Sequence, residues 1–246
     1  MKARIQFSLG LCLMTLSGWV RTAGAADQVW YDGGANNVWS LGDLNWDGGA
    51  AGWTDGNNAV FSGGGETVDV SGAVSVGNIV FQTNSYVIAD ADANGSLTLA
   101  GAPSVIEVQG AGNTGTVSEV IAGAGGFTKT GAGQLRLTAA NTYAGTTTVS
   151  AGVLRLNPNT LAALGATGAG NNTVVEAGAT LDFNGSYAGS GTLERFTIAG
   201  AGVDGQGVLV NTGTGHTNKN LEEVLLADDA TIGARTVIGN GVDIGD

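Results

Sequence analysis

The sequence predicts an all-β fold: a right-handed parallel β-helix with a tryptophan-rich cap at its N-terminal end. Short bursts of alternating apolar residues recur along the chain, which is the period-two pattern of half-buried strands. Glycine supplies 44 of the 246 residues and proline only 2, so tight turns are expected between the bursts. No burst is long enough to fold alone, so each needs a neighbouring coil to bury its apolar face.

Residues 1–25 are expected to be a cleaved signal peptide outside the fold. Lys2 and Arg4 form a positive start, residues 5–20 are apolar, and small residues at 23–25 resemble a cleavage site. An uncleaved N-terminal anchor is the alternative. Cleavage would remove the one cysteine, so a long backbone ladder rather than disulfides would hold the fold.

The negative net charge of the chain limits the classes of partner that it can bind. Lysine and arginine together number 9 against 21 aspartate and glutamate, a formal net charge of −12. Such a charge argues against nucleic acid and against anionic lipid surfaces. It suits a solvated outer surface.

Residues 26–60 are predicted to form the N-terminal cap. They hold four of the five tryptophans, namely Trp30, Trp39, Trp46 and Trp53. The first coil of a solenoid would expose the end of its core, and bulky aromatic side chains can cover that end. An aromatic platform that binds sugars is the alternative reading of the same four residues.

Residues 61–246 are predicted to form the β-helix itself, at about 20–25 residues per coil. The spacing of the bursts also fits a β-sandwich or barrel, but their shortness and the lack of hairpin dipeptides favour the solenoid. The expected strands are Thr67–Val70, Val74–Val76, Asn78–Phe81, Tyr86–Ala89, Ser96–Ala100, Val105–Val108, Val117–Ala122, Gly126–Lys129, Gln134–Thr138, Thr146–Ser150, Val153–Asn157, Asn172–Glu176, Thr180–Phe183, Thr192–Ile198 and Gly207–Asn211.

Only two segments suggest helix. Thr160–Leu164 is at most a turn. Asn218–Leu226 carries Leu221, Val224 and Leu225 at i, i+3 and i+4, which predicts a short helix capped by Asn218, with a strand as the alternative.

Residues 125–157, GGFTKTGAGQLRLTAANTYAGTTTVSAGVLRLN, carry a family pattern. The matching positions are Gly125, Gly126, Thr128, Lys129, Gly131, Gly133, Leu135, Leu137, Asn141, Thr142, Tyr143, Gly145, Thr147, Val149, Gly152 and Leu154. The segment resembles the passenger-associated β-strand repeat of autotransporter-type proteins. That resemblance implies a right-handed parallel β-helix passenger of a Gram-negative bacterium, with a structural role in secretion and no catalytic residues to transfer.

The sequence offers only weak candidates for a catalytic or metal-binding site. His216 is the only histidine and lacks soft partners for zinc. Asp90, Asp92 and Asn94 fit only the first half of a calcium loop, because position 12 is Gly101, so a turn explains them. The residues that could serve a polysaccharide-cleaving enzyme are Asp182, Glu194, Arg195 and Asp204, but they are scattered along the sequence. Solvated surface charge explains Glu222, Glu223, Asp228 and Asp229 more simply.

A last motif repeats every six residues near the end of the chain: Ile232-Gly233, Ile238-Gly239 and Ile244-Gly245. It resembles the hexapeptide of left-handed β-helix acyltransferases. The run is shorter than one coil of that fold, so ordinary solenoid sequence explains it.

These observations predict a non-catalytic passenger segment of a secreted or surface protein, with no cofactor, no metal and no catalytic residue. A surface adhesin or glycan-binding module is the first alternative, and a polysaccharide-active enzyme is the second. The expected partners are the outer-membrane translocation machinery or an extracellular glycan, host or matrix surface, met by a monomeric passenger. Because such repeats normally travel with a membrane anchor, a fragment of a longer protein is expected.

Overall fold

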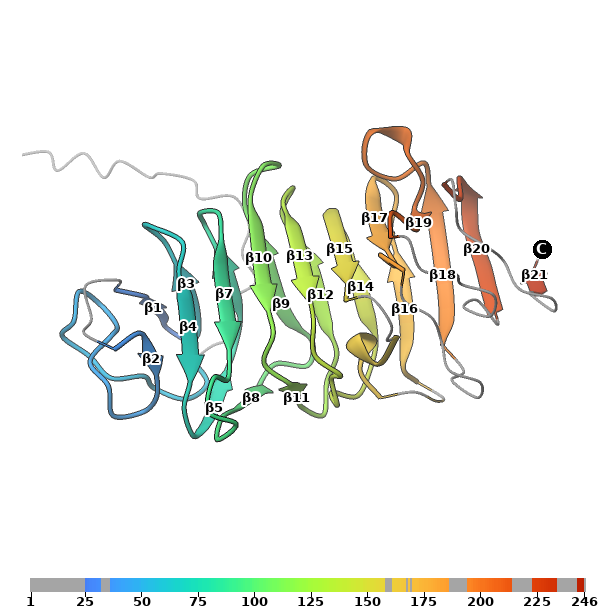
Figure 1. The fold of residues 1–246 in the computed structure, drawn as a ribbon. Helices are drawn as coiled ribbons and strands as arrows, with labels where there is room; N and C mark the ends of the chain where they lie inside the picture. The colour runs from blue at the N-terminus through green and yellow to red at the C-terminus, as the bar shows by residue number, and fades with distance from the viewer. Residues whose placement is uncertain are drawn as a thin grey trace, which may run out of the picture.

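The computed structural model describes residues 25–31, 36–157, 161–166, 168, 170–185, 194–213, 223–233 and 243–245, which form a parallel β-solenoid (Figure 1). Short strands stack coil upon coil from the N-terminal to the C-terminal end. Every named strand pairs in parallel with a neighbour from another coil. The prediction of an all-β parallel β-helix is therefore confirmed.

Within the described residues, the strands form three sheets of ten, eight and three strands. The ten-stranded sheet holds β1 (Asp27–Val29), β3 (Asn58–Phe61), β6 (Ile79–Phe81), β9 (Ser104–Val108), β12 (Phe127–Thr130), β14 (Thr147–Val149), β16 (Asn172–Val175), β18 (Arg195–Gly200), β20 (Glu223–Ala230) and β21 (Asp243–Gly245). The eight-stranded sheet holds β2 (Val38–Trp39), β4 (Thr67–Val70), β7 (Tyr86–Ala89), β10 (Thr114–Val117), β13 (Gln134–Leu137), β15 (Gly152–Leu156), β17 (Ala179–Asp182) and β19 (Leu209–Val210). The three-stranded sheet holds β5 (Ala73–Val76), β8 (Ser96–Leu99) and β11 (Ile121–Ala122).

The helical content of the described residues is two 3₁₀ turns, η1 (Leu161–Leu164) and η2 (Val203–Gly205). The first agrees with the turn expected at Thr160–Leu164. The predicted helix over Asn218–Leu226 is wrong where the structure describes it, because β20 begins at Glu223 and pairs with β18. Leu225 explains the error, since its side chain is 46% exposed and does not belong to a buried helical face.

Two further expectations need correction. The strand predicted over Val117–Ala122 is two strands, because the chain turns a corner between β10 and β11. The backbone N–H groups of Ser118 and Glu119 both donate to the carbonyl of Ile88 at that corner, and the intervening residues leave the ladder. Coil length also varies more than expected, from 19 residues between the paired Gln134 and Val153 to 31 between Asp27 and Asn58.

The core consists of in-register columns of inward side chains. In the eight-stranded sheet one column runs Ile88, Val117, Leu137, Leu156, and each of these side chains is at most 1% exposed. Fully burying such a side chain contributes about 1.5–3 kcal/mol. The matching column of the ten-stranded sheet runs Ile79, Ile106, Lys129, Val149, Val175 and Ile198, so a lysine occupies an interior position there.

The four tryptophans pack together at the N-terminal end of this core. Trp39 and Trp46 are fully buried, and Trp30 and Trp53 are each 3% exposed. Their ring centroids lie 4.6–5.2 Å apart in edge and tilted contacts, with Phe61 beneath them. The predicted cap is confirmed. The alternative of a sugar-binding platform is wrong for these rings, because buried faces cannot stack on a ligand.

Candidate functional site in the repeat coil

Lys129 is the most unusual residue of the coil that carries the repeat pattern. Its side chain is fully buried. Its ammonium donates three hydrogen bonds to backbone carbonyls, at 2.9 Å to Thr130, 2.8 Å to Gly131 and 2.8 Å to Ala151. Ala151 lies in the turn before β15, so the ammonium joins two successive segments of the repeat. Among the described residues, no carboxylate contacts it directly.

Burial lowers the pKa of Lys129 to about 8, while the negative charge of Glu107 acts in the opposite direction. The physical cause is desolvation, which disfavours the charged form of a buried amine. The three carbonyl oxygens are the groups that stabilise the charged form. The lysine therefore links two segments of the coil, and its charge-assisted hydrogen bonds offset only part of the cost of burying its charge.

Asn141 and Tyr143 fix the corner of the same coil. The Asn141 side chain accepts a 2.9 Å hydrogen bond from the N–H of Ile121 and donates a 2.7 Å bond to the carbonyl of Ala163. It therefore bridges the coil before and the coil after its own. The hydroxyl of Tyr143, which is fully buried, lies 2.6 Å from Oγ1 of Thr147.

Two glycines of the pattern are required by close backbone approach. A Cβ on Gly126 would lie 1.8 Å from the carbonyl oxygen of Thr146. Gly152 has φ 64°, and a Cβ there would lie 2.4 Å from the carbonyl oxygen of Gly133. These contacts explain why the repeat carries glycine at the start of its first strand, β12, and of its fourth strand, β15.

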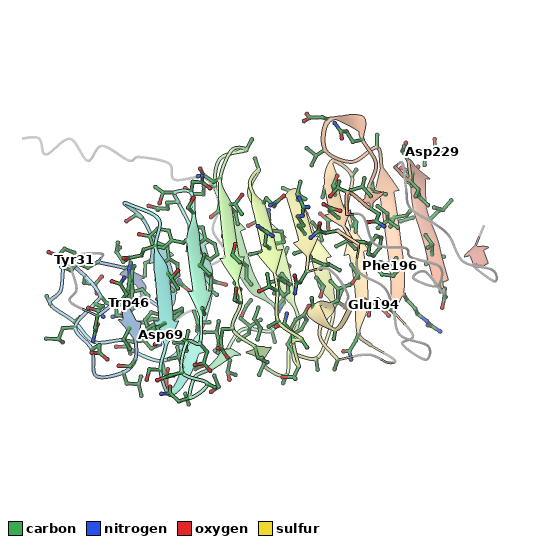
Figure 2. All side chains as sticks on the ribbon, viewed as in Figure 1. Tyr31, Trp46, Asp69, Glu194, Phe196 and Asp229 are labelled. Carbon is green, nitrogen blue, oxygen red and sulfur yellow. The ribbon has the colours of Figure 1, made fainter. Side chains whose placement is uncertain are left out.

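A second polar group lies inside the solenoid at Glu194 (Figure 2). Its carboxylate accepts a 2.6 Å hydrogen bond from Oγ1 of Thr173, and the residue is 4% exposed. Burial raises its pKa to about 7, and the Thr173 hydrogen bond opposes that rise. Burial also raises the pKa of Tyr143, with a smaller contribution from the charge of Glu194.

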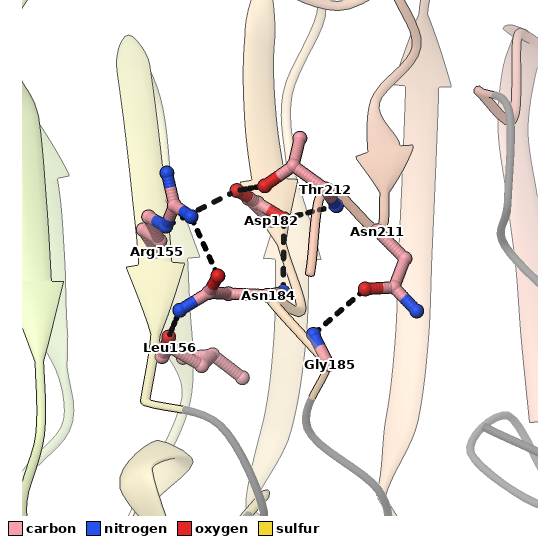
Figure 3. A network of polar contacts seen from close by, with 7 residues as sticks. All are labelled: Arg155, Leu156, Asp182, Asn184, Gly185, Asn211 and Thr212. Carbon is pink, nitrogen blue, oxygen red and sulfur yellow. Dashed lines mark hydrogen bonds and ion pairs between the residues drawn. The ribbon is translucent and has the colours of Figure 1, made fainter. Parts of the chain in front are cut away.

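Asp182 is held in a separate polar network on the eight-stranded sheet (Figure 3). It accepts hydrogen bonds from the N–H of Asn184 at 2.9 Å and from the N–H and hydroxyl of Thr212 at 3.0 and 2.5 Å. Its other partner is Arg155, whose Nε lies 3.5 Å away. Asn184 also donates a 3.0 Å bond to the carbonyl of Leu156. These contacts tie three coils together and occupy the carboxylate.

The candidate catalytic carboxylates do not converge. Within the described residues, the hydrogen bonds and ion pairs of Asp182 and Glu194 share no partner. Arg195 points outward and forms a 2.7 Å ion pair with Glu223 on the neighbouring strand. Asp204 lies in η2 with φ 51°. Within the described residues, Asp182 and Glu194 are therefore engaged with separate partners, and no contact joins them as the acid and base of a glycoside hydrolase.

The remaining charged candidates lie on the surface or beyond the described residues. Asp229 is exposed, and its N–H donates a 2.8 Å bond to the carboxylate of Asp228. Glu222, His216 and the pair at 238–239 lie outside the described residues. Ile232 forms a parallel bridge with Leu209, which agrees with ordinary solenoid sequence.

Asp90 and Asp92 lie in a turn, as expected. Asp90 accepts hydrogen bonds from the N–H groups of Asn94 and Gly95 at 3.1 and 3.0 Å. The structure adds Asp69 from the preceding coil, and one oxygen of each of the three aspartates lies within 4.8 Å of the others. One carboxylate oxygen of Asp69 accepts a 2.6 Å hydrogen bond from the N–H of Ala91. The absence of a metal site stays a prediction.

Sequence reasoning missed that Lys129 and Glu194 point into the core. The signal was present in the period-two pattern, because Lys129 lies two residues after the inward Phe127, and Glu194 lies two residues before the inward Phe196. Because both side chains are charged, the alternation was not taken to place them on the inward face. In the described part of the chain, no helix has the length and apolar character needed to cross a membrane.

Comparison with known proteins points to the same segment as the repeat coil described above. The passenger-associated-transport-repeat family matches residues 127–156. The chain is 34% identical over 240 aligned residues to the adhesin BmaC autotransporter of Brucella suis biovar 1 (strain 1330). This similarity covers 90% of the present chain and 6% of that adhesin, so the chain spans a small part of the length of its relative. No solved structure matches the chain.

Proposed function

We propose that this chain, which carries a passenger-associated-transport-repeat over residues 127–156, is a non-catalytic, exported passenger segment that promotes secretion and presents a surface stalk. The observation that carries the proposal is the repeat coil over residues 127–156. There Lys129 and Asn141 join one coil to its neighbours through backbone carbonyls. Such bonds favour coil-by-coil stacking once a first coil has formed.

The experiment is an in-frame deletion of one whole coil from the passenger fused to an outer-membrane barrel. Removing residues 127–146 joins Gly126 to Thr147 and keeps the sheet in register, because Phe127 and Thr147 are paired. We expect surface display to fall sharply, measured as protease accessibility of an N-terminal epitope on intact cells.

The matched control removes a coil outside the repeat. Residues 79–105 form such a coil, because Ile79 pairs with Ile106. We expect this deletion to reduce display less than the deletion of residues 127–146. Equal loss in both deletions, or full display without the repeat coil, would contradict a specific role of the repeat in secretion.

Adhesion is the second candidate function, favoured by the similarity to an adhesin over 90% of the chain. Glycan binding through Trp39 and Trp46 has no support, since both rings are fully buried. In the described part of the cap, the large apolar side chains that are exposed are instead Val29, Tyr31, Leu41 and Leu44. Binding of the purified protein to host cells or matrix, lost in Leu41→Ser with Leu44→Ser, would support adhesion.

We propose that the mature chain is exported after cleavage near residue 25 and works outside the inner membrane. The positive start and apolar stretch of residues 1–20 support this localisation. N-terminal sequencing of the secreted protein tests it, with a start at residue 26 as the expected result.

A further inference from the structure

Four polar side chains lie close together inside the core of the coils that carry β14, β16 and β18. Thr147 and Thr173 face each other in register on β14 and β16 and are at most 1% exposed. Tyr143 bonds to the first hydroxyl, and Glu194 bonds to the second. The set therefore spans three successive coils, and Glu194 is its one carboxylate.

We propose that the contact between the coils of β16 and β18 depends on the protonation of Glu194. When Glu194 is protonated it holds the two coils together, and when it is ionised it loosens that contact. Within the described residues, the one hydrogen bond to its carboxylate comes from Thr173. A neutral carboxyl is adequately solvated by such a contact. An ionised carboxylate that is 96% buried is not, because charge burial without a cation is costly.

Among the residues that the structure describes, the groups around Glu194 offer no compensating positive charge. Tyr143 stays neutral, since burial raises its pKa. Arg195 directs its guanidinium outward to Glu223, and the ammonium of Lys129 is bound to three carbonyls elsewhere in the core. The neighbouring strand β17 ends in Asp182, a buried carboxylate whose charged partner is Arg155. The described surroundings therefore favour the protonated form.

The direction of the pH effect follows from linkage. Burial raises the pKa of Glu194 from 4.5 to about 7. Below pH 4.5 the folded and unfolded states both hold the proton. Between pH 4.5 and 7 the unfolded state ionises first, so stability is lost as the pH rises. The unfolding constant should increase on the order of 100-fold across this interval.

The test compares unfolding midpoints of the purified chain at pH 4.5 and pH 8. Glu194→Gln keeps the shape and cannot ionise, so its midpoint should fall less with pH than that of the unaltered chain. Glu176→Gln is the matched control, because Glu176 is an exposed carboxylate that follows β16, and it should retain the full pH dependence. Equal pH dependence in all three proteins would overturn the proposal.

Hydrogen exchange of the unaltered chain keeps the proposal testable if Glu194→Gln does not fold. After correction for intrinsic exchange rates, amides of β16 and β18 should lose protection between pH 5 and pH 8, while amides of β3 and β6 should not. A uniform change along the solenoid, or no change in β16 and β18, would overturn it.

Discussion

Lys129 allows a quantitative test of how the repeat coil is stabilised. The side chain is fully buried, and three carbonyls accept hydrogen bonds from its ammonium. Burial lowers its pKa from 10.5 to about 8. Between these two values the unfolded state binds the proton and the folded state releases it, so stability should rise with pH.

The expected size follows from the pKa difference. Each pH unit inside the interval contributes up to about 1.36 kcal/mol. From pH 8 to pH 9.5 the unfolding free energy should therefore rise by about 1.5 kcal/mol, allowing for partial titration at pH 8. This window avoids Glu194, which is already ionised in both states, and it avoids Tyr143, whose raised pKa would reduce stability above pH 10.

The assay is urea unfolding followed by far-ultraviolet circular dichroism at each pH, with Lys129→Met as the control. Methionine fills a similar volume and does not titrate, so the rise should disappear in that variant. A flat or falling stability in the unaltered chain would refute the reasoning. It would mean that the three carbonyl bonds outweigh desolvation and hold the folded pKa at or above the ordinary value.

Three further predictions concern packing and the polar network. Gly115→Ala should cost about 1–3 kcal/mol, because its Cβ would lie 2.5 Å from the Phe81 ring, whereas Gly112→Ala meets nothing within 4 Å and should be near neutral by urea unfolding. Trp46→Ala should cost about 3–5 kcal/mol and red-shift the remaining tryptophan fluorescence, because its fully buried ring fills the cap. Asp182→Ala should cost about 2–4 kcal/mol by urea unfolding, since it leaves Arg155 without its ion-pair partner. For Trp46→Ala or Asp182→Ala, a loss of stability below about 0.5 kcal/mol would contradict the role assigned to that residue.

The repeating strands and the cap could be predicted because they follow from local rules. Period-two patterning placed β7, β8 and β13 within one residue of their observed bounds. The same rule could not place the corner between β10 and β11, because Val117 and Ile121 continue the alternation while the chain changes sheet. A corner is set by hydrogen bonds such as Ile121 to Asn141, 20 residues later, which local patterning does not contain.

The candidate sites were harder to predict because their chemistry depends on contacts between coils. Asp182 and Glu194 look alike in sequence, and both are buried. One is paired with Arg155 and the hydroxyl of Thr212, and the other faces an apolar interior with one hydroxyl partner. Their partners lie about one coil away in sequence, so only stacking distinguishes the two carboxylates.

Disulfide trapping tests the stacking register most directly. Thr128 and Thr148 pair on adjacent strands β12 and β14, and paired positions lie about 4.8 Å apart, within the range for a disulfide. In a Cys12→Ser background, Thr128→Cys with Thr148→Cys should cross-link rapidly in the folded protein. Thr128→Cys with Thr197→Cys, three coils apart, should not. Cross-linking of the distant pair alone, or of neither pair, would contradict the parallel solenoid on which the whole account depends.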